Sequence, residues 1–479
     1  MTGPADLPTA GPTEALDAGL GLRRWLSDRE NTDTVVGRGS ERDRRVAWTT
    51  AASIAARAAS IAVSLVTVPL VVTYLGSERY GLWLTISSMV ALVGPLDLGV
   101  GNGLRQVVAD AFGRGDELRM RHAISTAIGL LGALGFALLA ACPVLVGLDW
   151  PSLLNVTTQQ AQTEAGPTVI VLVASAAIGL PLSAISVTQA ALQAGYIAAL
   201  WSIAGTVLSV LALVVVVTSQ GGLPLLAGAM TFTTLVVTAI NGIVYFGRHR
   251  PELSPRLREF QPTMARTLLG TGVVFLVLQV AGMIGYEIDN IVISRVIGPE
   301  AVQQYAIPMK LFMLTPAVLV LGLMPLWPAY REAAARGDMA WVRRTLRRSV
   351  ALTAVATAVA SVGLVVFGPA ILAWWVGDAV TPTPALLIGM GLWAIAFGVS
   401  TCLAMLLNAA DVIKSQAILA IVMATVNLAL SVALVREIGV AGAVYGSLIA
   451  QVSFILIPFG VLVPAAMRRL ESKSHALPL

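Results

Sequence analysis

Twelve apolar stretches, each close to the length that crosses a bilayer, run through this 479-residue chain. About 20 apolar residues are needed to cross roughly 30 Å of hydrocarbon. Only 12% of the residues are charged and 57% are apolar, which leaves too little polar surface for a water-soluble fold. We therefore predict an all-α membrane protein. Its transmembrane helices are expected at 48–73, 80–102, 124–147, 168–192, 198–218, 223–246, 267–294, 306–327, 349–368, 384–407, 414–435 and 440–464.

The chain repeats itself at an offset of 222 residues, which carries Arg114-Gly115-Asp116 onto Arg336-Gly337-Asp338. The same offset carries Leu75-Gly76 and Glu78 onto Ile297-Gly298 and Glu300. Duplication of a membrane-embedded unit builds two lobes around a central path in many transporters. We expect two pseudo-repeated six-helix bundles, at 48–246 and 267–465, joined by a cytoplasmic linker at 247–266.

Lysine and arginine gather on one predicted side of the membrane. Of the 31 such residues, 26 fall before residue 48, within 103–123, 247–266 and 328–348, at Lys414, or after residue 464. Cytoplasmic loops of membrane proteins carry an excess of these residues. We therefore expect a multi-pass membrane protein with both termini in the cytoplasm. The net charge of +5 then reports topology and gives no sign of nucleic-acid binding.

The two ends of the chain differ from the apolar stretches between them. Residues 1–47 combine Pro, Gly and Thr with many charges and contain no apolar run of signal-peptide length. We expect a disordered cytoplasmic tail there, and a second cytoplasmic tail at 466–479.

Few residues in the sequence suit catalysis. The three histidines, His122, His249 and His475, fall on predicted cytoplasmic loops or the tail, and no HExxH, GxSxG or phosphate-loop pattern occurs. Cys142 and Cys402 lie in predicted helices and support neither a disulfide nor a metal site. We expect no enzyme, no cofactor and no metal.

A polar stripe follows one face of the first predicted helix. Ser53, Arg57, Ser60, Ser64 and Thr67 are spaced by four, three, four and three residues. Arg57 lies roughly 14 Å beyond Trp48, and exposing it to lipid would cost at least about 2.5 kcal/mol. We expect Arg57, Ser53, Ser60 and Ser64 to line a substrate cavity. The alternative is a structural arginine held by backbone carbonyls or a neighbouring helix.

The seventh predicted helix carries a related face. The 222-residue offset places Gln279 at the position of Arg57 and Tyr286 at that of Ser64, and Asn290 continues the face. We expect these three residues to line the same cavity.

Two acidic residues, Glu287 and Asp289, flank that face. They could form a cation or proton site that couples transport to a gradient, or they could pair with Arg295 or Lys310. Lys310 lies four residues into its apolar stretch, so we expect it to extend toward the membrane surface and rank it second as a ligand.

Three glycines loosen the end of the second predicted helix. Gly99, Gly101 and Gly103 follow Asp97 at two-residue spacing. This segment could act as a gating hinge, or the glycines could allow close helix packing.

Amides mark one face of the fourth predicted helix. Ser186, Gln189 and Gln193 are spaced by three and four residues. We expect Gln189 and Gln193 to contact sugar hydroxyls, with hydrogen bonding between helices as the alternative.

Four ordered motifs stand out: Tyr74-Leu-Gly-Ser-Glu-Arg-Tyr-Gly-Leu-Trp83, Asp97-Leu-Gly-Val-Gly-Asn-Gly-Leu104, Gly113-Arg-Gly-Asp116, and Asp289-Asn-Ile-Val-Ile-Ser294 with Gly298 and Tyr305. Together they resemble the polysaccharide-exporter branch of the MOP flippase superfamily, over about residues 48–465. The resemblance implies two six-helix bundles around a central cavity. It also implies that they move undecaprenyl-diphosphate-linked oligosaccharides to the external leaflet by alternating access, beside other polysaccharide-assembly proteins.

The sequence departs from two groups of relatives. Flippases of the peptidoglycan precursor carry several arginines in their first helices, whereas Arg57 is the only one in the first two apolar stretches here. Related multidrug exporters use acidic residues as cation sites, which Glu287 and Asp289 could supply. We predict a lipid-linked-oligosaccharide flippase in a bacterial inner membrane. The alternatives are a cation-coupled multidrug exporter and a membrane scaffold of a glycan-assembly complex that transports nothing.

Overall fold

The computed structural model describes residues 35–92, 97–323 and 326–475, and these residues form helices and turns with no β-strand. Nine helices in the described part are long and apolar enough to cross a membrane. The predicted all-α membrane fold is confirmed.

The first half of the chain forms α2 (Val35–Ala91), α3 (Val100–Arg114), α4 (Glu117–Val146), α5 (Trp150–Leu153), α6 (Gln159–Ala191), α7 (Gly195–Thr218), α8 (Leu223–Val244) and the turn η2 (Tyr245–His249). The linker forms η3 (Pro251–Leu253) and η4 (Leu257–Glu259). The second half forms α9 (Pro262–Val296), α10 (Pro299–Leu323), α11 (Leu326–Ala335), α12 (Met339–Val376), η5 (Gly377–Ala379), α13 (Pro384–Ala409), α14 (Ile413–Ile438), α15 (Ala441–Gln451), η6 (Val452–Leu456) and α16 (Ile457–His475).

Three passes add to these nine helices: the second pass, and the passes of α9 and α10, whose side chains lie partly outside the described part. The chain turns inside α2 at Gly76, whose φ of 74° is not helical, so α2 holds the first pass and the start of the second. The second pass is completed by α3, and α15 with α16 forms the last pass. Glycine suits this turn because a Cβ atom disfavours positive φ.

Helices extend past the predicted span boundaries. Helix α2 begins at Val35, so residues 35–47 are helical rather than a disordered tail, and residues 1–34 lie outside the described part. Helix α16 continues to His475. Near its end, the carboxylate of Glu471 accepts a 2.5 Å hydrogen bond from Arg343 of α12. Hydropathy marks only the stretch that contacts lipid, whereas helical hydrogen bonding continues into water.

The internal repeat is visible in the backbone. Five left-handed residues of the first half recur in the second half, in the pairs Gly76/Gly298, Gly115/Gly337, Asn155/Gly377, Gln193/Asp411 and Gln220/Gly439. The carboxylates of Asp116 and Asp338 each accept a 2.9 Å bond from the amide three residues later and cap α4 and α12. The two halves therefore turn at equivalent places.

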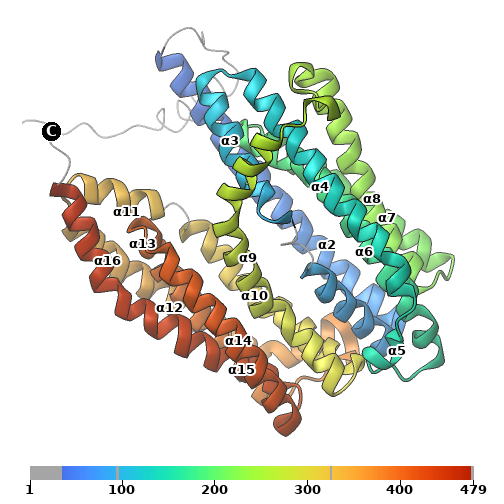
Figure 1. The fold of residues 1–479 in the computed structure, drawn as a ribbon. Helices are drawn as coiled ribbons and strands as arrows, with labels where there is room; N and C mark the ends of the chain where they lie inside the picture. Colours follow the sequence, from blue (N-terminus) through green and yellow to red (C-terminus); the bar gives the residue numbers. More distant parts are fainter. Residues whose placement is uncertain (1–34, 93–96, 324–325, 476–479) are drawn as a thin grey trace, which may run out of the picture.

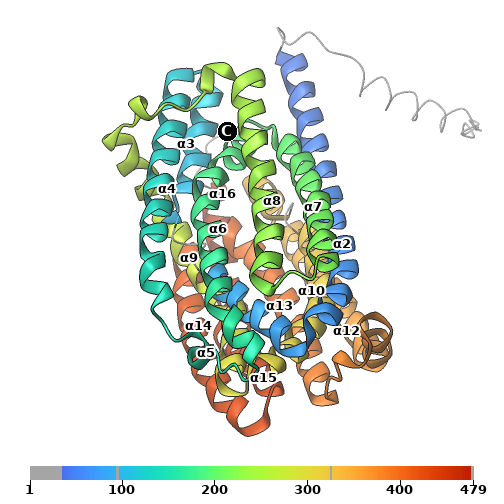
Figure 2. The ribbon, with the colours of Figure 1, turned by 90° about the vertical axis from the view of Figure 1, so that its right-hand side faces the viewer.

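The halves meet along a seam, where α2 and α3 face α9 and α10. Figure 1 shows the two groups of helices close together at one end and leaning apart at the other. The end at which they lean apart holds the α3–α4 and α11–α12 turns, and we name it the arginine-rich end. We name the end at which they lie close together the opposite end. In Figure 2, α4, α6, α8, α7 and α2 lie in a row. Ile307, Leu311 and Leu372 of the second half pack into the first half's core with Val68 and Leu75, near the opposite end.

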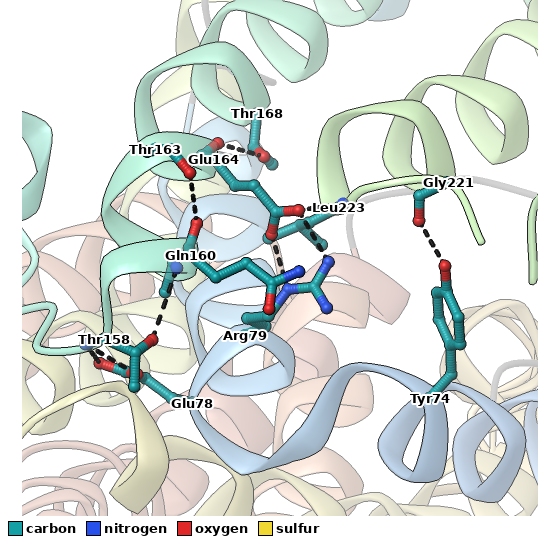
Figure 3. A network of polar contacts seen from close by, with 11 residues as sticks. Tyr74, Glu78, Arg79, Thr158, Gln160, Thr163, Glu164, Thr168, Gly221 and Leu223 are labelled. Carbon is teal, nitrogen blue, oxygen red and sulfur yellow. Dashed lines mark hydrogen bonds and ion pairs between the residues drawn. The ribbon is translucent and has the colours of Figure 1, made fainter.

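A polar network fixes the opposite end of the first half (Figure 3). Arg79 donates to both carboxylate oxygens of Glu164 on α6, at 2.6 and 2.7 Å, and both side chains are 12% exposed. Its neighbour Glu78 accepts bonds from Thr157 and Thr158 at the start of α6. The turn between the first two passes is thereby tied to α6.

We expect Arg79→Ala to destabilise the protein by roughly 2–3 kcal/mol, because it leaves the Glu164 carboxylate largely buried without its cation. The matched control is Arg114→Ala. Its pair with Asp110 is 65% and 45% exposed, so its loss should cost less than about 1 kcal/mol. Thermal unfolding in detergent compares the two variants, and equal losses would contradict this account.

Candidate functional site

Two cavities lie on the seam between the halves. The first has a volume of about 250 Å³ and is named the α2–α10 cavity. The second has a volume of about 460 Å³ and is named the α9 cavity. Lys310 and Met313 of α10 line both, so the two cavities adjoin.

The α2–α10 cavity holds cations from both halves of the chain. Arg57, Ser60 and Ser64 reach it from α2, and Lys310 reaches it from α10. Apolar side chains complete the wall, among them Ile61, Leu65, Leu311, Leu314 and Trp375. Arg57 is exposed and forms no ion pair or hydrogen bond with any described residue. The alternative of an arginine tied to backbone carbonyls finds no support among those residues.

Lys310 lies well inside α10. Because α10 begins at Pro299, Lys310 is roughly 16 Å from the start of the helix. Its ammonium nitrogen lies 3.4 Å from the hydroxyl of Tyr80 on α2. Tyr80 adjoins Arg79 and Gly81 in the sequence, so the expectation that Lys310 extends toward the membrane surface stays a prediction.

The α9 cavity is lined by acidic and polar side chains. Glu287, Asp289 and Asn290 come from α9, Ser88 from α2 and Ser447 from α15. The amide nitrogen of Asn290 donates to Ser88 Oγ at 2.9 Å, which joins the two halves.

A cage of oxygen atoms encloses Asp289, which is 2% exposed. Its carboxylate accepts from Tyr305 at 2.8 Å, Ser431 at 2.9 Å and Ser447 at 2.6 Å. The two serines also lie 3.0 and 3.1 Å from Asn427 Oδ1. Each serine has one hydroxyl hydrogen but contacts both acceptors. A proton on Asp289, a bound cation or a reversed Asn427 amide would balance this cage.

Neither predicted acidic residue forms an ion pair with a described residue. Arg295 instead donates to the carbonyls of Ser152 and Leu153 at 2.6 and 3.1 Å. Lys310 contacts only Tyr80 among the polar groups described. The alternative in which Glu287 or Asp289 pairs with these cations is therefore not observed among the described residues.

The predicted amides of α6 lie away from the seam cavities. Gln189 is fully buried and exchanges two hydrogen bonds with Asn241 of α8, at 2.9 and 3.2 Å. This arrangement matches the alternative of hydrogen bonding between helices. Gln193 occupies the α6–α7 turn with φ 58°, and neither residue lines the α2–α10 or the α9 cavity.

Three other predicted residues are not among the described residues that line the two cavities. Ser53 is exposed on α2 and does not line either cavity. The side chains of Gln279 and Tyr286 lie outside the described part of the structure.

The predicted hinge coincides with a break between α2 and α3. Asp97 accepts bonds from the amides of Gly99 and Gly101 at 2.8 and 3.3 Å, and so caps α3. Gly99 has a φ of 75°, while Gly101 and Gly103 are buried within α3. The break supplies the geometry that a hinge requires, and gating at this place remains a prediction.

The sequence pattern predicted Asp289 as a site residue and included Tyr305 in a motif, but it did not predict the other three residues of the cage. Asn427 and Ser431 are one helical turn apart on α14, and Ser447 lies on α15. An amide in the middle of an apolar helix was the available signal, because polar side chains in membrane helices need partners. Nothing in the sequence pattern pairs that amide with α9.

Comparisons with known proteins place the fold. Neither protein-family models nor curated protein sequences yield a match. Among solved structures, the chain is similar to an inward-facing multidrug resistance MATE family transporter of the MOP superfamily, with TM-score 0.69, 14% identity, and coverage of 85% of this chain and 99% of that chain. An outward-facing MATE family transporter gives TM-score 0.62, 15% identity and coverage of 89% and 96%.

A third similar structure is a MOP superfamily transporter from Pyrococcus furiosus described as having a binding pocket of reverse polarity. It gives TM-score 0.59, 14% identity and coverage of 89% and 96%. At these identities the likeness concerns the fold. The chain has the two-lobed helical fold of the MATE transporters.

Proposed function

We propose that this protein is a flippase that moves a lipid-linked oligosaccharide across the plasma membrane by alternating access, for cell-surface polysaccharide synthesis. One observation carries the proposal: Arg57 and Lys310, from different halves, line one cavity on the seam. Charges at this depth of a membrane are costly, so they mark ligand pathways.

The lining of the α2–α10 cavity supports an amphipathic anionic substrate. Two cations suit the diphosphate of an undecaprenyl-diphosphate-linked glycan, and Ser60 and Ser64 can bond to hydroxyl groups. The apolar wall, which includes Leu65 and Leu314, suits hydrocarbon. Its halves also carry the fold seen in inward-facing and outward-facing transporters.

A second candidate function is cation-coupled multidrug export. The α9 cavity favours it, because Glu287 and Asp289 line a volume of about 460 Å³, which lies within the usual range for small-molecule sites. Lys310 shares that cavity, which disfavours cationic drugs there. We therefore rank export second and assign the acidic residues to ion coupling within the flippase proposal.

We expect Arg57→Ala and Lys310→Ala each to lower glycan export at least about tenfold, because each removes a charge-assisted contact with the diphosphate. Lipid-linked glycan on the cytoplasmic leaflet is measured, with membrane abundance of the protein as a reference. The matched control is Ser53→Ala. Ser53 lines neither cavity, so this variant should export the glycan normally.

Three outcomes would contradict the flippase. Loss of the protein from the membrane in Arg57→Ala would indicate a structural arginine. Normal glycan export with new sensitivity to cationic drugs after deletion would indicate the exporter. Normal glycan export together with unchanged drug sensitivity after deletion would indicate the scaffold that transports nothing.

Gradient coupling is proposed for the cage around Asp289. Carboxylate, hydroxyl and amide oxygens are hard ligands that suit sodium, and a carboxylate can also carry a proton. We expect Asp289→Asn and Glu287→Gln to reduce the response of transport to a sodium or proton gradient. Export measured in vesicles under each gradient tests this. Indifference of the unaltered protein to both gradients would remove the coupling role and favour a reversed Asn427 amide.

The arginine-rich end is proposed to face the cytoplasm, in a bacterial plasma membrane. Its α3–α4 and α11–α12 turns carry Arg114, Arg119, Arg336 and Arg343. Reporters inserted at residue 155 should respond outside the cell, and reporters at residue 255 inside. The reverse pattern would overturn the orientation.

A further inference from the structure

The two halves approach each other closely at one glycine. A methyl carbon built on Gly81 of α2 would lie 1.7 Å from the carbonyl oxygen of Pro299 and 2.5 Å from its carbonyl carbon. Pro299 is the first residue of α10, so this contact joins the first half to the second at the opposite end. Both clashing atoms are backbone, and a side-chain rotation cannot relieve them.

Hydrogen bonds reinforce the seam at the same end. Arg295, at the end of α9, donates to the carbonyls of Ser152 and Leu153 on α5. The hydroxyl of Ser294 donates to the Leu154 carbonyl at 3.2 Å. The end of α9 is thus tied to α5 in the first half.

The arginine-rich end has a different pattern. Among the described residues, its ion pairs join residues of one half, or the first half to the linker, as in Arg331 with Asp411, Arg343 with Glu471 and Arg121 with Glu259. No hydrogen bond or ion pair of these residues joins α3 or α4 to α11 or α12. The structure is therefore closed at the opposite end.

We propose that Gly81 and Pro299 form the closing contact of a gate at the opposite end, and that the missing side chain at Gly81 is what allows the gate to shut. Separation of the halves is the movement that relieves a clash at this position, because the clashing backbones belong to different halves. The gate concerns the conformational cycle and does not depend on the substrate.

The internal repeat shows why this device is asymmetric. The residue equivalent to Gly81 in the second half is Gln303, by the 222-residue offset. Gln303 lines a separate cavity of about 390 Å³ with Ser77 and Pro299. A long side chain and a cavity thus stand where the first half has a glycine and a backbone contact.

The chain offers two matched glycine controls. A methyl carbon on Gly135 would lie 2.3 Å from the carbonyl oxygen of Ala177, but both residues belong to the first half. Gly132, also on α4, has no atom within 4 Å of a built methyl carbon. Gly135→Ala strains one half without involving the gate, and Gly132→Ala strains nothing.

The experiment measures distances between spin labels at residues 118 and 340. Leu118 and Ala340 are exposed, repeat-related positions at the arginine-rich end. Cys142 and Cys402 are replaced by alanine so that the spin labels attach only to the cysteines introduced at positions 118 and 340. We expect Gly81→Ala to shift the main population to shorter distances, changing the ratio of the two populations by about tenfold or more.

The controls separate gating from misfolding. Gly132→Ala should leave the distances and the thermal stability unchanged, and Gly135→Ala should lower stability without shortening the distance. Arg295→Ala inserts no atoms and removes a gate bond, so it should shift the population in the same direction as Gly81→Ala. An unchanged 118–340 distance in Arg295→Ala, or in folded Gly81→Ala, would overturn the gate. The same shift in Gly135→Ala would overturn it as well.

Discussion

The cost of placing a charge in hydrocarbon organises this molecule. Four charged side chains fall in the apolar stretches 48–73, 267–294 and 306–327, namely Arg57, Glu287, Asp289 and Lys310. Each would be expensive against lipid, and all four line the two cavities on the seam. The need to shelter them explains why the polar stripe of α2 faces α10, and why the seam cannot be a packed apolar interface along its whole length.

Sequence periodicity predicted the spans and the repeat because both depend on residues near one another in the chain. It placed Arg57, Ser60 and Ser64 on a single face, and the structure brings all three to one cavity. Periodicity could not predict which other helix packs against a given polar face. Gln189 satisfies its amide with Asn241, 52 residues away, because a buried amide needs a partner whichever helix supplies it. Asp289 likewise meets Ser431 and Ser447 only through packing.

The duplicated halves carry different side chains at equivalent positions. The 222-residue offset relates Arg57 to Gln279, Asp289 to Thr67, and Lys310 to Ser88. The cation of the first half therefore has no charged equivalent, and the acidic cage belongs to the second half alone. Ser88 and Lys310 nevertheless line the same α9 cavity, so repeat-related positions still converge on the seam. The shared fold keeps the positions, while the side chains divide the proposed anion and cation sites between the halves.

The distribution of hydrogen bonds indicates which parts move together. Within each half, bonds such as Gln189 to Asn241 and Ser447 to Asp289 are buried, where breaking them leaves unsatisfied groups. Across the seam, the bonds of Arg295 to Ser152 and of Trp375 to Leu65 are exposed, whereas the bond of Ser294 to Leu154 is buried. Exposed groups can exchange a protein partner for water at little cost. The exposed bonds favour opening along the seam, and we propose rocking of the two halves about their shared cavities as the motion.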